Sequence, residues 1–134
     1  MQKKIRKFRF EKLVRDKIVE GIVNAGNIPH YYKLNKKDYI KELKKKLLEE
    51  ALEFPKAKNN KEIVEEIADI QEIIDNLILV LKVSKSDLAK IQKVKNKIRG
   101  SFKKRLYIDT VEAINNSEWV KYYLANPDKY PEIK

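Results

Sequence analysis

Residues 47–75, LLEEALEFPKAKNNKEIVEEIADIQEIID, hold nine carboxylates in a chain whose formal net charge is +11. A proline and two asparagines interrupt this segment at residues 55–60. On each side of the break, acids recur three residues apart and apolar residues recur every three or four. That spacing is typical of amphipathic helices. The segment therefore predicts two helices joined by a short connection, each with its acids on a defined face.

Each of these two helices has an apolar stripe with a pair of acids on one flank. Glu50 and Glu53 flank the first stripe, and Glu66 and Asp69 flank the second, offset in the same sense. A connection of about five residues makes the helices antiparallel neighbours. The two-fold rotation that relates such a pair preserves the sense of the offset. We therefore expect the four carboxylates to converge at one edge of the core, whereas Glu49 points away from it.

Converging carboxylates at a half-buried edge repel one another and lose hydration, which favours protonation or a bound cation. The chain has no cysteine and one histidine, His30, so thiolate sites and zinc sites with several imidazoles are excluded. Oxygen ligands suit Mg²⁺ together with waters and substrate phosphates, whereas Ca²⁺ usually takes a denser cage. The same acids also fit ordinary helix flanks paired with lysines. The residues alone leave both interpretations open.

The rest of the chain predicts an all-α protein, an antiparallel helical bundle in a single domain of 134 residues. Pro55 ends one helix, and Asn59 with Glu62 forms a capping-box pattern that starts the next. His30 fits a turn, and Trp119 fits packing better than stacking on a base. The expected helices span about residues 11–25, 36–54, 59–83, 84–100 and 117–124, with short extended segments near 30–34 and 105–109.

Composition and charge narrow the cellular setting and the partners. The longest apolar run, residues 77–81, is too short to span a membrane. The basic start MQKKIRKFRF lacks the apolar region and cleavage site of a signal peptide. We therefore expect a soluble, cytoplasmic protein with no membrane partner. The charge of +11 favours anionic partners, from nucleotides to nucleic acid, without choosing among them.

Three motifs in order resemble the all-α nucleoside triphosphate pyrophosphohydrolases, a superfamily that includes MazG, dimeric dUTPases and phosphoribosyl-ATP pyrophosphohydrolase. Residues 49–53 and 66–69 resemble its EExxE…ExxD signature. Residues 12–18, KLVRDKI, and 97–102, KIRGSF, resemble the opening and the closing RGxF segment of a small MazG-like branch. Val19 stands where that branch often has proline. The resemblance covers residues 11–108, which would form a MazG-like helical core, and leaves residues 109–134 as a C-terminal extension without a counterpart.

The resemblance implies a house-cleaning enzyme that hydrolyses nucleoside triphosphates, non-canonical ones included, to the monophosphate and pyrophosphate. A metal-activated water would attack the α-phosphorus, with Mg²⁺ as the cofactor and Mn²⁺ as a substitute. The family usually forms homo-oligomers, and a partner subunit would complete the nucleotide pocket. Glu49 would support the ligands or face a partner. The implied catalytic and metal-binding residues are Glu50, Glu53, Glu66 and Asp69, and the basic candidates for the phosphates are Arg15, Lys17, Lys97 and Arg99.

An alternative is a basic helical protein that binds nucleic acid or has a structural role without catalysis. Such a protein needs a lysine-rich face away from the acids, to which Lys41 and residues 44–46 contribute. No nucleic-acid-binding motif is recognisable, so this alternative depends on charge alone. Nucleic acid is therefore not the expected partner.

Overall fold

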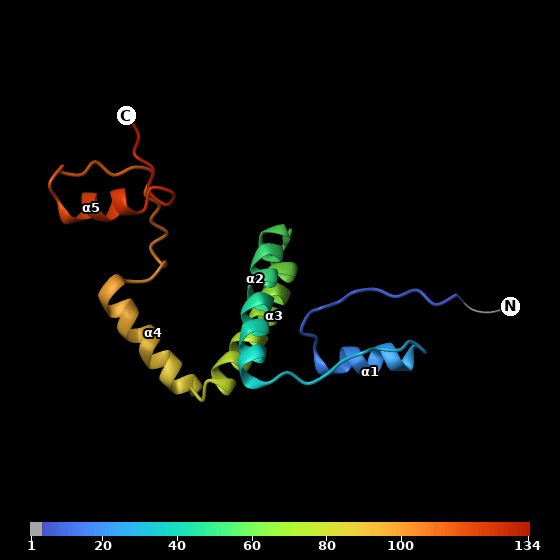
Figure 1. Cartoon of the computed structure of the whole chain (residues 1–134). Helices are drawn as coiled ribbons and strands as arrows, with labels where there is room; N and C mark the ends of the chain where they lie inside the picture. The colour runs from blue at the N-terminus through green and yellow to red at the C-terminus, as the bar shows by residue number, and fades with distance from the viewer. Residues whose placement is uncertain (1–3) are drawn as a thin grey trace. The chain divides into compact units, whose positions relative to one another are not determined.

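The computed structural model describes residues 4–134, and in this range the protein is all-α, as predicted (Figure 1). No strand forms in residues 4–134, and the segments 30–34 and 105–109 belong to irregular connections. Arg105 has a left-handed φ of 57°. The bundle stays a prediction, because α2 and α3 are the only helices in the described range that pack along one another. The helices are α1 (Asp16–Asn24), α2 (Lys36–Glu53), the 3-10 helix η1 (Phe54–Lys56), α3 (Asn60–Val80), α4 (Lys85–Arg99) and α5 (Glu118–Ala125).

The chain divides into two compact units, Met1–Val94 and Lys95–Lys134. The first unit holds α1, α2, η1 and α3, and the division falls inside α4. The expected helical core at 11–108 and the extension at 109–134 stay predictions, as does the single domain.

The ends of α2 and α3 are set by capping residues and a proline that can be recognised in the sequence. Asn35 starts α2 by accepting a hydrogen bond from the Asp38 amide at 2.8 Å. Pro55 lies in η1, which turns the chain after α2. Asn59 then accepts from the Glu62 amide at 2.9 Å, while Glu62 Oε2 accepts from the amide of residue 58 at 2.7 Å. The predicted cap of α3 is therefore present.

The hairpin buries only some of its apolar side chains. Leu43 of α2 and Ile73 of α3 are buried, at 3% and 7% exposure. Helix α3 is apolar over a wide arc, and α2 covers only the part of that arc around Ile73. Four other large apolar side chains of the hairpin are each at least half exposed, and we call them the open apolar residues: Leu48 and Leu52 of α2, and Val64 and Ile67 of α3.

The first helix is shorter than the sequence predicts. We expected it to begin near residue 11, but α1 begins at Asp16, and Arg15 is its extended N-cap residue, with φ −68° and ψ 149°. Glu11 has a left-handed φ of 45°, which an α-helix excludes. Asp16 suits a first turn, because its charge complements the helix dipole. Residues 11–15 therefore form a non-helical segment that leads into α1.

Helices α4 and α5 differ in what they bury. Helix α5 is capped by Ser117, and its Tyr123 ring lies 4.9 Å from that of Tyr130 and 6.3 Å from that of Trp119. The Tyr123 ring packs between those of Trp119 and Tyr130, and Trp119 stays 66% exposed. Every residue of α4 is exposed. Within residues 4–134, no helix combines the length and apolar character needed to cross a membrane.

Candidate metal centre

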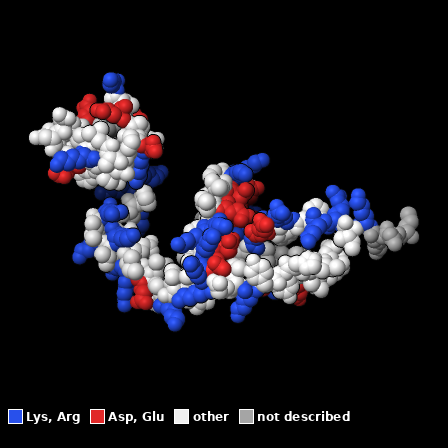
Figure 2. All heavy atoms as spheres, viewed as in Figure 1, with Lys and Arg blue, Asp and Glu red and all other residues white. Residues whose placement is uncertain are grey.

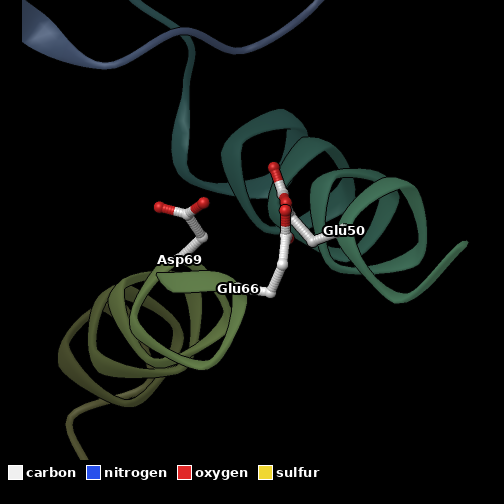
Figure 3. Close-up of side chains that lie close together, drawn as sticks. All are labelled: Glu50, Glu66 and Asp69. Carbon is white, nitrogen blue, oxygen red and sulfur yellow. The ribbon is translucent and has the colours of Figure 1, made fainter. Parts of the chain in front are cut away.

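Three carboxylates from the two packed helices meet at one edge of the hairpin. Glu50 projects from α2, and Glu66 and Asp69 project from α3 (Figure 3). One carboxylate oxygen of each lies within 4.8 Å of the others, and all three residues are half-buried. Figure 2 shows a patch of acidic side chains over this hairpin, with Lys and Arg beside it. Side chains 16 to 19 residues apart thus form one cluster.

Helix register explains why the two glutamates point inward. Glu50 follows the buried Leu43 by seven residues, and Glu66 precedes the buried Ile73 by seven residues. Seven residues are about two helical turns, so each glutamate lies on the buried face of its own helix. In an antiparallel pair these two positions come to the same level. The packing face of α3 is centred nearer to Glu66 than the predicted stripe, which buries this side chain further.

The cluster has an electrostatic cost in the absence of a cation. Burial raises the pKa of Glu50 above its usual 4.5, and a hydrogen bond with the Glu66 carboxyl raises it further. The charges of Glu66 and Asp69 act in the same direction, and Lys46 opposes them. Two carboxyls can share such a hydrogen bond only when one holds a proton. The site therefore favours a proton or a cation between these side chains.

A second observation at Glu66 also indicates that protein groups alone do not complete the site. Its Oε2 atom is buried and has no hydrogen-bond partner among residues 4–134. A buried carboxylate oxygen without a partner costs free energy, and native proteins rarely retain one. This atom lies at the cluster where three acids converge, so a bound cation would supply the missing interaction.

Glu53 and Glu49 lie outside the cluster. Glu53, which we expected to converge with the other three, pairs with Lys56 at 3.3 Å and is half exposed. It lies three residues after Glu50 on the same helix, and the lysine that follows in η1 holds its carboxylate. Glu49 pairs with Lys46 at 3.4 Å and with Lys12 at 3.9 Å. The assignment of Glu53 as a ligand and of Glu49 as a supporting residue stays a prediction.

The basic residues predicted to hold phosphate fall into two groups. Arg15 lies at the cluster, where its Nη2 donates to Asp69 Oδ1 at 2.8 Å. Lys17 lies in the first turn of α1 and is exposed. Lys97 and Arg99 are exposed residues in the last turn of α4, within the second unit. No ion pair in residues 4–134 involves any of these last three side chains. Their phosphate contacts stay predictions.

Two contacts of the hairpin were not expected from the sequence. The segment that contains Lys12 and Arg15 reaches acids of both packed helices, because residues 11–15 are not helical. Tyr39 of α2 donates to Asn76 of α3 at 3.3 Å. Tyr39 lies four residues before the buried Leu43, so its position on the packed face is a signal that helix register carries.

Comparisons of the chain with protein-family models, with curated proteins and with solved structures found no match. The functional interpretation therefore rests on the residues and on the geometry described above.

Proposed function

We propose that this protein is a Mg²⁺-dependent nucleoside triphosphate pyrophosphohydrolase that releases nucleoside monophosphate and pyrophosphate. The observation that carries the proposal is the convergence of Glu50, Glu66 and Asp69, with a buried, unpartnered oxygen on Glu66. The motifs of residues 12–18, 49–53 and 66–69 resemble this enzyme class and support the same activity. Non-canonical nucleotides are the proposed substrates, and the cytoplasm is the proposed location.

The donor set fits Mg²⁺. All three side chains offer carboxylate oxygen, which this hard cation prefers. One oxygen of each carboxylate lies within 4.8 Å of the others, so the three side chains could hold one cation together. Mn²⁺, with similar ligand preferences, is the expected substitute.

The residues would divide the work between the cation and the phosphates. Glu50, Glu66 and Asp69 would hold the cation, and Glu53 would add a fourth carboxylate if its side chain turned away from Lys56. A bound Mg²⁺ supplies charge that offsets the phosphates and makes a nearby water a better nucleophile. Arg15 is already at the cluster and can transfer from Asp69 to a phosphate, because an exposed ion pair contributes only about 0–1 kcal/mol.

A homo-oligomer would supply what the hairpin lacks. The four open apolar residues are at least half exposed, and only two apolar side chains in residues 4–134 are buried. A second copy can cover exposed apolar side chains and form the other side of a nucleotide pocket. We propose that the active form is a dimer or a higher oligomer.

A product assay tests this function. Purified protein is incubated with Mg²⁺ and a panel of canonical and damaged nucleoside triphosphates, and monophosphate, diphosphate, pyrophosphate and orthophosphate are quantified. We expect monophosphate and pyrophosphate in equal amounts, with activity lost on chelation and restored by Mg²⁺ or Mn²⁺. Diphosphate with orthophosphate would place the attack at the γ-phosphorus and contradict the proposal. Salt-sensitive nucleic-acid binding without turnover would favour the alternative.

A matched pair of variants tests the site itself. Asp69→Asn removes a carboxylate of the cluster, and we expect turnover to fall by about a thousandfold or more because the ion loses a ligand. Glu20→Gln removes an exposed carboxylate of α1, away from the cluster, and should leave turnover within about twofold, as is usual for surface substitutions. Equal activity of the two variants would refute the assignment of the site.

A further inference from the structure

Helix α4 is an amphipathic helix whose apolar residues have no partner. Its 15 residues are all exposed, and it carries six basic residues and one acid, a formal charge of +5. An isolated helix of this length is marginal in water, so its stability depends on tertiary packing. One face collects its large apolar side chains at helical spacing, and these are Leu88, Ile91, Val94 and Ile98, with exposures of 37%, 54%, 58% and 77%.

Helix α3 has the complementary character. It carries six acids and one lysine, a formal charge of −5. Val64 and Ile67, two of the open apolar residues, lie on α3 and are 62% and 50% exposed. The exposed acids Glu65 and Glu72 lie on the flank of α3 beyond these two residues. The protein therefore has an apolar surface bordered by acids and a separate apolar helix face bordered by lysines.

The corner between the two helices is held by its own hydrogen bonds. After α3, the amides of residues 81, 82 and 83 donate to the carbonyls of residues 77, 79 and 78. Ser84 Oγ accepts from the Asp87 amide at 3.0 Å, which starts α4 as a capping box does. Lys85 pairs with Asp75 at 3.9 Å. These contacts fix the start of α4 while all of its residues stay exposed, so its apolar face is available to another molecule.

We propose that α4 of one copy docks along α3 of a second copy, with Leu88, Ile91 and Val94 covering Val64 and Ile67. The lysines of α4 would then lie beside Glu65 and Glu72 of the other chain. The arrangement is reciprocal, so two chains close a symmetric pair in which α4 is exchanged. This inference rests on the homo-oligomer proposed above and names its interface.

A second copy of the chain can cover the apolar residues and pair the charges of both α3 and α4, which other partners do not. A nucleic acid would neutralise the lysines of α4 and leave the apolar residues of α3 and α4 in water. An anionic membrane surface would accept α4 and leave the acids of α3 unpaired. The exposed acids Glu65 and Glu72 of α3 and the lysines of α4, together with exposed apolar residues on both helices, favour the chain itself as the partner.

A pair of variants in α4 tests the interface. Ile91→Glu places a charge in the proposed contact, and Ala89→Glu adds the same charge on the other side of the helix. We expect the dissociation constant of the dimer, measured by sedimentation equilibrium of the full chain, to rise about tenfold or more for Ile91→Glu and less than about threefold for Ala89→Glu. A dimer unaffected by Ile91→Glu, or weakened equally by both, would overturn the docking. A wild-type chain that is monomeric would overturn it as well, and the product assay would still report on the enzymatic proposal.

Cysteine crosslinking distinguishes a second copy from the same chain, because the protein has no natural cysteine. Ile67→Cys and Ile91→Cys are made in separate chains that carry affinity tags of different size, then mixed and oxidised. A disulfide between the two tagged chains is the expected result, and Ile67→Cys with Ala89→Cys is the control that should not link. If the double variant Ile67→Cys/Ile91→Cys links within one chain and the mixed chains do not link, α4 folds onto its own α3 and the proposal is wrong. Absence of any link also contradicts it.

Discussion

Helices α3 and α4 follow one another in the chain and begin in the same way, yet one buries a side chain and the other does not. Asn59 caps α3 and Ser84 caps α4, each by accepting from an amide three residues later. Both helices are amphipathic. Ile73 of α3 is 7% exposed because α2 lies against it, whereas Ile91 of α4 is 54% exposed. Local sequence starts a helix, and a packing partner decides which face it buries.

The two helices also differ in the sign of their charge and in where their charged side chains find partners. Helix α3 carries a formal charge of −5, and Asp69, one of its acids at the cluster, pairs with Arg15 from the segment before α1. Helix α4 carries +5, and its one ion pair to another element in the described range is that of Lys85 with Asp75. We interpret α3 as a helix whose site is assembled within the first unit and α4 as a helix whose partner comes from outside the chain.

The largest expected effect contrasts truncation of the two helices. Ile73→Ala removes a buried side chain of α3 and should lower the free energy of unfolding by about 2–5 kcal/mol at every protein concentration. Ile91→Ala should lower it only where copies associate, because the α4 side chain is exposed within one chain. Denaturant unfolding at several protein concentrations measures both. An equal, concentration-independent loss for Ile91→Ala would mean that α4 packs within its own chain.

The sequence predicted what depends on local spacing. The all-α class, the break at Pro55 and the cap at Asn59 follow from residues within one or two turns of each other. The start of α1 was predicted five residues too early, because the conformation of Glu11 and the contact of Arg15 with Asp69 depend on parts of the chain far apart in sequence. Local propensity carries no information on such contacts.

The candidate site was also predicted only as far as local spacing determines it. Helix phase placed four acids on one flank, and three of them meet in the structure. Phase alone could not show that Lys56, in the turn after α2, holds Glu53. It also could not show how far α3 rotates about its axis when several of its faces are apolar. That rotation determines how deeply Glu66 is buried, because α2 covers only one part of the apolar arc.

The second prediction tests the charge contrast through Arg15. Arg15→Ala should weaken binding of a non-hydrolysable triphosphate analogue by about 1.5–3 kcal/mol, the usual size of a charge-assisted contact. Binding of the monophosphate should change much less, because it lacks the phosphates that Arg15 would hold. Arg9→Ala, which removes an exposed arginine paired with Glu11, is the control. Titration calorimetry with both ligands measures the effect, and equal losses for both ligands would show that Arg15 holds the structure or the α-phosphate instead.

The third prediction compares the two helix caps. Asn59→Ala and Ser84→Ala should each cost about 1 kcal/mol locally, since each removes an acceptor for a backbone amide. Loss of the α3 cap should appear in global unfolding, because α3 carries the packed face. Loss of the α4 cap should appear as faster amide exchange within α4, with unfolding of the hairpin unchanged. A Ser84→Ala variant that destabilises the hairpin would contradict this prediction and show that α4 supports the hairpin directly.

The smallest expected effect concerns the proton balance of the cluster in metal-free protein. Burial, the Glu66 carboxyl and the charge of Asp69 raise the pKa of Glu50 above 4.5 in the folded state. The folded state therefore binds more protons than the unfolded state between pH 4.5 and the raised pKa, so the free energy of unfolding falls as pH rises through that window. Glu50→Gln removes this titration, so the metal-free variant should be more stable than wild type at neutral pH and flatter in its pH dependence.

Saturating Mg²⁺ should reverse the order of the two proteins. The cation stabilises wild type through the carboxylates that Glu50→Gln disrupts, so wild type gains more stability from the ion than the variant does. Thermal unfolding with chelator and with Mg²⁺, from about pH 4 upward, measures the stability of both proteins under both conditions, and Glu20→Gln is the control for loss of one exposed negative charge. A Glu50→Gln protein that is less stable than wild type without metal would show that the carboxylate of Glu50 stabilises the hairpin. The repulsion at the acidic edge would then be too weak to call for a cation, whereas the packing contrast between α3 and α4 would stand.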